Sequence, residues 1–538
     1  MILKNPTSLR SITLEPDCAI VIGSGAVGTY LGVQLARRGR QVVVLESGDR
    51  SLGGFGPESF AVVGRACGGI RLARSRSLGG TSNLWGGQLV EFLPIDFDGR
   101  GWLPGSRWPV RYDEIAPFYG PTYEALGIEP SMQRDDPVWR ELKKPRVALG
   151  EGLEVFLTRW MRVPNVAAHF GADVESSDRL LVVLGATAVG FEAAGDRITG
   201  VIVVDEQGNR SVVRGGDVVL AAGTIENARL LLHARDDDSW RCPWRCNDNI
   251  GRRFQDHLGG RIAYIRPRDD RSFFDVFCTI VLRGYKFQPK VRVRDEVQRR
   301  EESLNVQGFI AFESSVQENL VYLKQFMKAA LQGKKNGSVR EFARHTVACW
   351  RHMLPLMWKF VVEHRVLIPS GSKISLFVQS EVQPVAESRI TIDPTTRDRY
   401  GLPKVILDWR LSGRELADIA AFGRRVGRAL SAAELAELEL EPELAAGDPA
   451  FLERLVDTYH QAGGCCMGAS PADGVVDRDL RVFGTPNLYV AGACVFPTSS
   501  NANTTFTAMT FATRLAEHLT KRGAEHRGRP LETHHAAG

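Results

Sequence analysis

The sequence has no run of eighteen apolar residues, and it therefore predicts no membrane-spanning helix. Residues 1–17 contain neither an apolar leader stretch nor a twin-arginine pair, so we expect a cytoplasmic protein. Nine scattered cysteines form no even framework of the kind that stabilises small secreted domains, which favours a reducing compartment. The net charge of +5, from 68 basic and 63 acidic residues, is too small to indicate nucleic acid as a partner.

A nucleotide-binding unit is predicted near the start of the chain. Residues 19–22 form an apolar strand pattern, a helical pattern ends at Gly39, and residues 41–45 form a second apolar strand that ends at Glu46. Between the first strand and the helix lies G-x-G-x-x-G, at Gly23, Gly25 and Gly28. A glycine motif within a complete βαβ unit indicates a bound dinucleotide, and either FAD or NAD fits this unit alone.

Each residue of this unit has a physical role in that interpretation. Gly23 permits the tight turn, Gly25 lets the backbone approach a pyrophosphate, and Gly28 lets the helix pack closely on the sheet. The helix N-terminus at Ala26 faces the phosphates, and Glu46 can hold the adenosine ribose hydroxyls.

Four later segments decide between the two cofactors. They are a glycine-rich turn "RSLGGTSNLWGG" (76–87), a strand, turn and helix "DVVLAAGTIENARLLL" (217–232), "NIGRRFQDHL" (249–258), and "NLYVAGACVFPTSSNANTTFTAMTFATRLAEHL" (487–519). In this order, over nearly the whole chain, they resemble the glucose–methanol–choline (GMC) family of FAD-dependent oxidoreductases. Within that family they are most similar to the pyranose oxidase and sugar or polyol dehydrogenase branch.

The resemblance implies an α/β fold. A discontinuous Rossmann-like FAD-binding domain, of the type also found in p-hydroxybenzoate hydroxylase, would carry an inserted α+β substrate domain built on an antiparallel sheet. We expect FAD-binding parts at 1–96, 176–265 and 456–525, substrate parts at 97–175 and 266–455, and a disordered tail at 526–538. In addition, residues 430–447 predict a helix with an acidic surface.

The resemblance also assigns the cofactor site. Besides Gly23, Gly25, Ala26, Gly28 and Glu46, it points to Gly80, Thr81, Ser82, Asn83, Trp85, Gly86, Gly87, Val189, Ala222, Gly223, Gly492, Ala493, Asn503, Thr504 and Thr505. Some relatives attach the flavin through a histidine just before the tryptophan, where this chain has Leu84. Since leucine cannot form that bond, we expect non-covalent FAD.

The catalytic candidates are His460 and Asn503. His460, in "HQAGGCCMG", matches the family's catalytic histidine, and Asn503, in "NANTTFT", matches its second active-site residue. Hydride transfer from an alcohol to flavin N5 requires removal of the hydroxyl proton, and a histidine suits that step because its pKa lies near neutrality. An amide can hold the substrate oxygen without competing for the proton. His257 is interpreted as a residue that supports the flavin site.

We predict no metal site. The adjacent Cys465 and Cys466 cannot easily both bind one zinc ion, and a disulfide between them would be strained, so they are interpreted as buried inert thiols. Cys242 and Cys246 are interpreted as structural, although a metal site in that loop stays an alternative.

A basic stretch at 320–366 has nine Lys or Arg residues against two Glu. Within it, residues 338–354 predict an amphipathic helix that Pro355 interrupts. A helix packed on the substrate domain is the favoured interpretation, and peripheral contact with the inner face of a membrane is the alternative.

The sequence thus predicts oxidation of a CH–OH group of a sugar, polyol or glycoside. Alternatives are a non-sugar alcohol such as a sterol, a choline-like compound or a natural-product intermediate, a non-redox lyase of the same fold, or a non-catalytic flavoprotein. Oxygen, a quinone and a protein are all candidate electron acceptors, and no motif selects among them.

Overall fold

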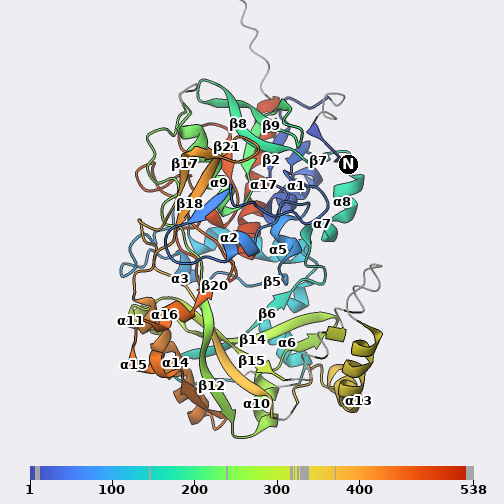
Figure 1. Ribbon diagram of the computed structural model, residues 1–538, viewed down its shortest axis with the longest axis vertical. Coiled ribbons are helices and arrows are strands. Elements are labelled where there is room, and N and C mark those ends of the chain that lie inside the picture. The colour runs from blue at the N-terminus through green and yellow to red at the C-terminus, as the bar shows by residue number, and fades with distance from the viewer. Residues whose placement is uncertain are drawn as a thin grey trace, which may run out of the picture.

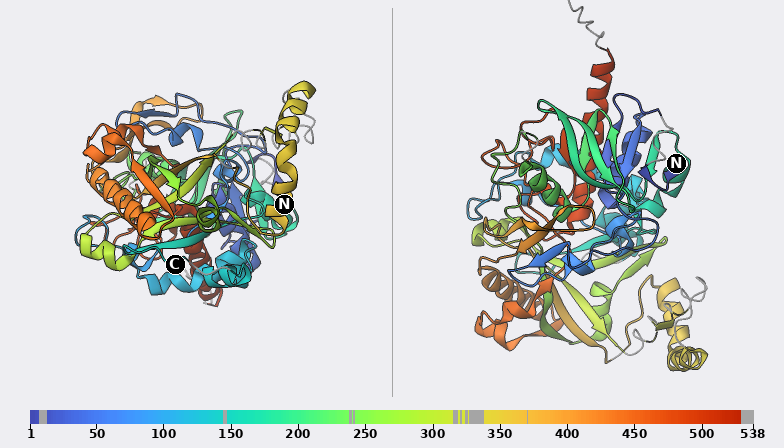
Figure 2. Two further views of the ribbon diagram at one scale, coloured as in Figure 1. Left: turned by 90° about the horizontal axis from the view of Figure 1, so that it is seen from below. Right: turned by 45° about the horizontal axis from the view of Figure 1, so that its top comes forward.

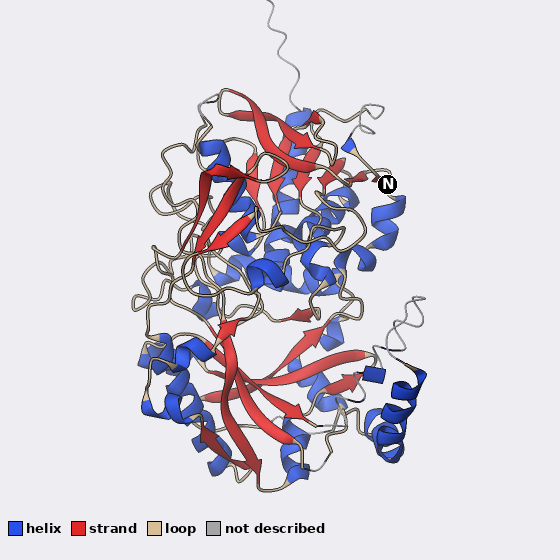
Figure 3. Cartoon of the chain, in the orientation of Figure 1, coloured by secondary structure: helices blue, strands red, loops and turns tan. Residues whose placement is uncertain are grey.

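The chain forms two halves stacked along the longest axis of the molecule (Figure 1). The computed structural model describes residues 1–6, 13–143, 147–237, 240, 242–314, 319, 322, 323, 326, 338–369 and 371–528. One half is built on a parallel sheet and the other on a large antiparallel sheet (Figure 3).

The first half contains a six-stranded parallel sheet of order β1-β7-β3-β2-β11-β21. Its strands are β1 (Ile2–Leu3), β2 (Ala19–Ile22), β3 (Val42–Leu45), β7 (Leu180–Val183), β11 (Asp217–Leu220) and β21 (Leu488–Val490). The four strands β2, β3, β7 and β11 are buried at every residue, as continuous apolar strands in a sheet covered on both faces must be. These strands come from three separate stretches of the chain, so the Rossmann-like unit is discontinuous.

Helices and a small sheet surround this parallel sheet. α1 (Ala26–Arg37) packs against α17 (Thr504–Gly528), and α9 (Thr224–Arg235) follows β11. The strands β8 (Thr187–Ala194), β9 (Arg197–Val204) and β10 (Arg210–Arg214) form an antiparallel sheet of their own. Short helices complete the two halves, namely α2 (Gly69–Leu72), α3 (Pro94–Phe97), α4 (Tyr112–Ile115), α5 (Tyr119–Ala125), α6 (Asp135–Glu141), α7 (Val166–His169), α8 (Gly171–Ser176) and α11 (Asp295–Glu301).

The second half is built on a nine-stranded sheet whose main path is β19-β12-β16-β15-β14-β6-β5. These strands are β19 (Ala436–Leu440), β12 (Leu258–Pro267), β16 (Lys373–Ser380), β15 (Val306–Glu313), β14 (Tyr285–Val293), β6 (Leu153–Trp160) and β5 (Gln88–Leu89), with β13 (Ile280–Leu282) and β20 (Val456–Asp457) beside them. Its strand pairs are antiparallel, and α14 (Glu415–Ala432) packs on it, while α10 (Asp270–Phe277), α15 (Pro442–Ala446) and α16 (Phe451–Arg454) lie nearby. The predicted fold class is therefore confirmed.

The predicted segment boundaries stay a prediction. Two strands inside a predicted substrate segment belong to a different sheet from the rest of that segment. β17 (Arg389–Arg397) and β18 (Pro403–Asp408) form a sheet with β4 (Phe60–Val62) instead of joining the large sheet. Residues 266–455 thus contribute strands to both halves (Figure 1). α17 continues to Gly528, and residues 529–538 of the predicted tail lie outside the described part of the chain.

Two predictions of local structure are wrong. Residues 430–447 are not one helix, because α14 ends at Ala432 and residues 436–440 form β19 on β12. Pro355 does not end the amphipathic helix, since α13 (Val339–Val361) continues through it. A proline removes one N–H donor from a helix, and the turns on either side keep their own hydrogen bonds.

The α13 helix stands apart from the body of the molecule (Figure 2). Val339, Trp350 and Met357, on its predicted apolar face, are 79%, 72% and 55% exposed. The favoured interpretation of a face packed on the substrate domain is therefore wrong. No helix within the described residues is long and apolar enough to cross a membrane.

Candidate active site

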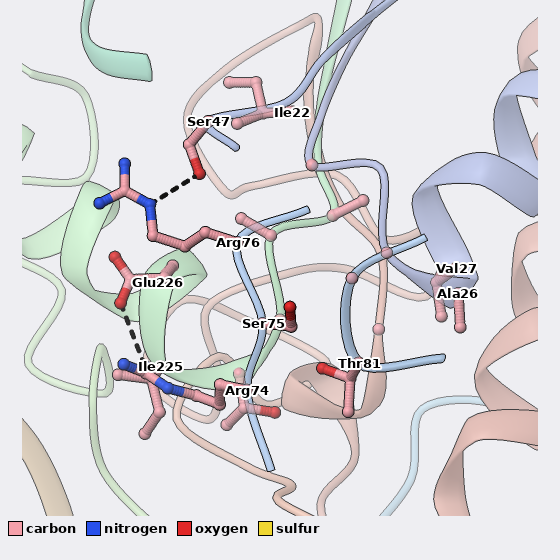
Figure 4. Close-up of a pocket in the computed structure, with 18 of the residues that line it drawn as sticks. Ile22, Ala26, Val27, Ser47, Arg74, Ser75, Arg76, Thr81, Ile225 and Glu226 are labelled. Carbon is pink, nitrogen blue, oxygen red and sulfur yellow. Dashed lines mark hydrogen bonds and ion pairs between the residues drawn. The ribbon is translucent and has the colours of Figure 1, made fainter. Parts of the chain in front are cut away.

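A deep cavity lies where the two glycine-rich turns meet (Figure 4). Its empty space amounts to about 1410 Å³, which includes open solvent at its mouth. The cavity reaches from Glu46, at the end of β3, to Thr504 and Thr505 at the start of α17. The cavity thus connects the first glycine turn and Glu46 with the start of α17.

Close backbone contacts explain why glycine stands at these turns. A Cβ atom on Gly28 would lie 2.0 Å from the Gly23 carbonyl oxygen, so only glycine lets α1 begin this close to β2. A Cβ atom on Gly80 would lie 2.7 Å from the Cα of Gly25, and Gly80 also has a positive φ of 50°. The first turn and the second turn are thus in direct contact and form one wall of the cavity.

Glu46 stabilises the first glycine turn through hydrogen bonds and also lines the cavity. Its Oε2 accepts hydrogen bonds from the Ser24 amide at 3.0 Å and the Ser24 hydroxyl at 2.7 Å. Its Oε1 accepts one from the Gly48 amide at 2.8 Å. Burial raises the pKa of the Glu46 carboxyl, while these donors oppose that shift. The ribose-binding role of Glu46 stays a prediction.

The structure brings most of the predicted cofactor residues to this cavity. Those that line it are Gly23, Gly25, Ala26, Glu46, Gly80, Thr81, Ala222, Gly223, Gly492, Ala493, Thr504 and Thr505. Gly28, Ser82, Asn83, Trp85, Gly86, Gly87, Val189 and Asn503 do not line it. In the region of Val189, the cavity wall consists of Ala186, Thr187 and Ala188.

Three arginines in the cavity wall, Arg74, Arg76 and Arg229, were not predicted as site residues. Arg74 forms an ion pair with Glu226 at 3.1 Å, and its guanidinium lies 3.9 Å from the Phe55 ring centroid. Arg76 donates to the Ser47 hydroxyl at 3.1 Å (Figure 4) and also to the Thr187 hydroxyl at 3.0 Å. The sequence signal for Arg74 and Arg76 was the pair of arginines directly before the second glycine turn.

His460 and Asn503, the two predicted catalytic residues, lie next to each other. The Asn503 amide Nδ2 lies 2.8 Å from His460 Nε2, and the amide Oδ1 is buried without a partner among the described residues. His460 also lines the cofactor cavity. The structure thus brings the two candidate residues together, and their catalytic roles stay a prediction.

His257 lies directly behind His460 and does not itself line the cofactor cavity. Its Nδ1 is 3.2 Å from His460 Nδ1, and its Nε2 is 3.1 Å from the Ser499 carbonyl oxygen. The Thr458 hydroxyl is 2.8 Å from His460 Nδ1. His257 comes immediately before β12 and His460 follows β20, and the pairing of these two strands brings the histidines together.

These contacts fix the tautomer of both rings. A carbonyl only accepts, so His257 Nε2 carries a proton and donates it to Ser499, which leaves Nδ1 as an acceptor. His460 Nδ1 must then carry the proton in the contact between the two rings. Its Nε2 keeps a free lone pair, which accepts the Asn503 N–H. The nitrogen that faces Asn503 is therefore the basic one.

Both rings are neutral in this environment. Burial lowers the pKa of His257 to about 4. Burial holds the pKa of His460 well below its ordinary value, and the repulsion that a protonated His460 would meet from a protonated His257 and from Lys290 lowers it further. His460 is thus an unprotonated base throughout the neutral range.

A buried carboxylate fixes the backbone of His460. Asp256 Oδ1 accepts the His460 N–H at 2.9 Å, and burial raises the Asp256 pKa well above its ordinary value. Among the described residues, Cys67, Asp256 and Asp457 form one buried group of potential metal ligands within 4.8 Å of one another. Backbone N–H groups of Gly68, Gly69 and His460 already donate to these carboxylates. The expected lack of a metal stays a prediction.

Cys465 and Cys466 are buried free thiols, and so are Cys242 and Cys494, whereas Cys246 is exposed. Burial raises the pKa of Cys466, which keeps the thiol protonated. Gly463 has a φ of 75°, and a Cβ there would lie 1.9 Å from the Arg253 carbonyl oxygen. The glycines, not the cysteines, let the chain after His460 turn closely.

The residues of the cavity fit FAD. The glycine turn at the start of α1 lines the cavity, where a helix N-terminus can receive a pyrophosphate, and Arg74 Nη2 is buried in the cavity wall without a partner among the described residues. At the other end, the N-terminus of α17 and His460 line the part of the cavity nearest the catalytic pair. Leu84, at the position of the flavin-linking histidine of some relatives, has an exposed side chain that offers no such bond.

Comparison with known proteins shows which families the chain matches. The profile of the FAD dependent oxidoreductase family matches residues 19–310, and that of the GMC oxidoreductase C-terminal domain matches residues 384–512. The 2-methyl-1,2-propanediol dehydrogenase of Mycolicibacterium austroafricanum is 22% identical, covering 94% of this chain and 95% of that protein. The fructose dehydrogenase large subunit of Gluconobacter japonicus is 21% identical, covering 94% and 98%. The crystal structure of pyridoxine 4-oxidase from Mesorbium loti matches with a TM-score of 0.56 and 18% identity, covering 93% and 99%.

Proposed function

The chain belongs to the GMC family of FAD-dependent oxidoreductases and oxidises a CH–OH group, and we propose that this group belongs to a sugar, a polyol or a glycoside. The observation that supports the proposal is the His460–Asn503 pair, held at 2.8 Å beside a cavity that fits FAD. Two relatives that align over nearly their whole length are named for a diol and for fructose as substrates.

FAD would be held non-covalently by the two glycine turns, by Arg74 and by the start of α17. When bound, it accepts a hydride from the carbon that carries the hydroxyl group. The part played by the protein is to orient the substrate and to remove the hydroxyl proton.

His460 Nε2 takes that proton. Its lone pair is directed toward Asn503, and a substrate hydroxyl that enters between them can donate to Nε2 while its oxygen accepts the Asn503 N–H. His257 and Thr458 hold the Nδ1 side of the ring, so the ring cannot turn its protonated edge toward the substrate. Asp256 fixes the backbone at the same residue.

An anaerobic substrate panel tests this function. Sugars, polyols and glycosides, together with simple monoalcohols, sterols and choline, are mixed with the holoenzyme while the flavin absorbance is followed. We expect bleaching by members of the polyhydroxylated group. If only non-sugar alcohols bleach the flavin, the substrate class is wrong, and if none does, a lyase or a non-catalytic flavoprotein is the better account.

The same reduced enzyme can identify the electron acceptor. Oxygen, a soluble quinone and a one-electron protein acceptor are each added after bleaching, and the rate at which the flavin absorbance returns is compared. The fastest acceptor at equal concentration decides between an oxidase and a dehydrogenase.

We also propose that α13 contacts a membrane surface peripherally. Its exposed Trp350 and Trp358 lie on the same helix as Arg340 and Arg344. Exposed tryptophans with arginines on a helix suit the boundary between lipid tails and anionic headgroups.

Liposome flotation tests this contact with anionic and zwitterionic vesicles. We expect wild type to float with the anionic vesicles, and Trp350→Ser/Trp358→Ser and Arg340→Glu/Arg344→Glu to remain in solution. Charge reversal of Arg266 and Arg424, on the surface of the substrate half, is the matched control. Equal flotation of all four proteins would end the proposal.

A further inference from the structure

Lys290 is a buried lysine in the middle of the large sheet. It lies on β14, opposite Phe156 of β6 and Phe309 of β15, and it is only 2% exposed. Its Nζ lies 5.6 Å from the Phe309 ring centroid. Residues directly opposite one another project from the same face of a sheet, so the Phe156 and Phe309 side chains share the face of Lys290.

This face of the sheet points toward the catalytic loop. Gln307 on β15 and Gln379 on β16 are also opposite one another, and both side chains donate to the Asn501 carbonyl, at 2.5 and 2.6 Å. Asn501 is two residues before Asn503. Gln307 shares the face of Phe309, because the two are separated by two positions on one strand. The glutamines thus connect the face that carries Lys290 to the loop that carries the catalytic amide.

A second contact extends this face across the sheet. Gln288, two residues before Lys290, accepts a hydrogen bond from Gln88 at 3.1 Å. Gln88 begins β5, a strand of the same sheet that directly follows the second glycine turn. The face that carries Lys290 therefore continues to the strand next to that turn.

Lys290 has no charge partner. Within the described part of the chain, its ammonium makes no hydrogen bond or ion pair, and burial alone lowers its pKa to about 7. Its charge acts on both catalytic-site histidines, since it lowers the pKa of His257 and of His460. A buried cation without a partner is unfavourable for folding, and such groups are concentrated at functional sites.

We propose that Lys290 binds a carboxylate of the substrate, so that the enzyme oxidises a CH–OH group of a hydroxy acid such as a sugar acid. A single ammonium group matches the single charge of a carboxylate, whereas a phosphate dianion would call for more cationic groups. Gln307 Oε1, buried without a partner among the described residues, can accept a hydrogen bond from a hydroxyl of the same molecule. This inference rests on the proposed CH–OH oxidation and narrows its substrate class.

The test combines binding with reduction, using the holoenzyme throughout. Acetate and its neutral counterpart acetamide are titrated while the absorbance of oxidised flavin is monitored. Matched donor pairs, glucose with gluconate and glycerol with glycerate, are then compared in anaerobic flavin reduction. The variants are Lys290→Met, Lys290→Arg and, as control on the same strand, the exposed Lys286→Met.

We expect wild type and Lys286→Met to bind acetate and not acetamide, and to bind the acid of each donor pair more tightly. Lys290→Met should weaken binding of the acids by about tenfold or more relative to the neutral donors, because only the acids lose a charge pair, whereas any change at His460 affects both kinds of donor alike. Lys290→Arg should keep part of the preference for the acid over the neutral donor. It also serves as the informative variant if Lys290→Met fails to retain FAD.

Equal effects of Lys290→Met on acids and neutral donors would overturn the proposal, and so would a wild-type enzyme that prefers the neutral donors. Reduction by neutral sugars alone supports the proposed function and contradicts the role of Lys290. If no donor reduces the flavin, the proposed function fails, and the acetate titration still shows separately whether Lys290 holds an anion.

Discussion

His257 Nδ1 lies 3.2 Å from Nδ1 of His460, and this contact sets which nitrogen of His460 is the base. His257 Nδ1 accepts a hydrogen bond from His460, because the other ring nitrogen of His257 carries the proton and donates it to the Ser499 carbonyl. His460 therefore keeps its proton on Nδ1 and presents the lone pair of Nε2 to the Asn503 side. His257 acts through His460 and is a positioning residue.

Replacing His257 should slow reduction of the flavin. His257→Leu removes the acceptor for the His460 Nδ1 proton, and the ring is then free to adopt the other tautomer or to rotate. We expect the rate of anaerobic flavin reduction to fall by roughly 10- to 100-fold, the size of effect that misplacement of a catalytic group produces. His257→Gln should retain more activity, because an amide oxygen can accept the same proton.

The control for this prediction is His169→Gln, since His169 contacts the Ala125 carbonyl at a distant site. A structural role alone would lower the thermal stability of His257→Leu and leave the reduction rate of the folded enzyme near that of wild type. That result would contradict the positioning role.

Acidification should destabilise wild type through His257. Its folded-state pKa of about 4 lies below the unfolded value of about 6.5, so the unfolded chain binds more protons between these values. The stability contributed by neutral His257 is therefore complete above about pH 6.5 and is lost as the pH falls toward about 4. Between about pH 7.5 and pH 5 this amounts to roughly 2 kcal/mol of the free energy of unfolding.

Urea unfolding of wild type and His257→Gln at both pH values measures this difference. The glutamine does not titrate, so its midpoint should fall less on acidification. Parallel loss of stability in the two proteins would show that other groups govern the acid response.

Adding one methyl group to Gly80 should impair FAD binding. In Gly80→Ala the new Cβ would lie 2.7 Å from Gly25 Cα, at a positive φ, so the two glycine turns must separate. We expect FAD affinity to fall by about tenfold or more, measured by reconstitution of the apoprotein. Gly54→Ala is the matched control because a Cβ at Gly54 meets no atom within 4 Å. Equal affinity of the two variants would show that the contact between the turns does not shape the FAD site.

The flavin should leave the protein on acid precipitation. Leu84 stands where some relatives have the flavin-linking histidine, and its side chain cannot form a covalent bond to the cofactor. Precipitation with trichloroacetic acid should therefore put all flavin absorbance into the supernatant. Yellow protein in the pellet would mean that another residue forms a covalent link.

Much of the first half could be predicted because its signals are local. The strands β2 and β11 begin and end close to the predicted residues, since apolar runs bounded by glycine turns have few alternatives. The prediction of a single helix at 430–447 was wrong because a tertiary contact overrides the local pattern. Ala436–Leu440 reads A-E-L-E-L, which suits both a helix and an alternating strand, and pairing with β12 selects the strand.

In the site, the sequence identified His460 and Asn503 as partners but missed three kinds of contact. Arg74 and Arg76 reach the cavity wall only because the second glycine turn folds back on the first. His257 lies beside His460 because β12 pairs with β20, which are about two hundred residues apart in the chain. Lys290 is buried by a sheet whose register no local pattern reveals.

The most direct test of the account is anaerobic single-turnover reduction of His460→Gln by the best donor from the panel. We predict that FAD stays bound, because His460 occupies only one end of the cavity. The rate of flavin bleaching should fall by about 10²- to 10⁴-fold, the usual contribution of a general base. Asn503→His, which retains a hydrogen-bond donor, should lose less than Asn503→Leu. Bleaching of FAD-loaded His460→Gln at the wild-type rate would contradict the assignment of His460 as the base.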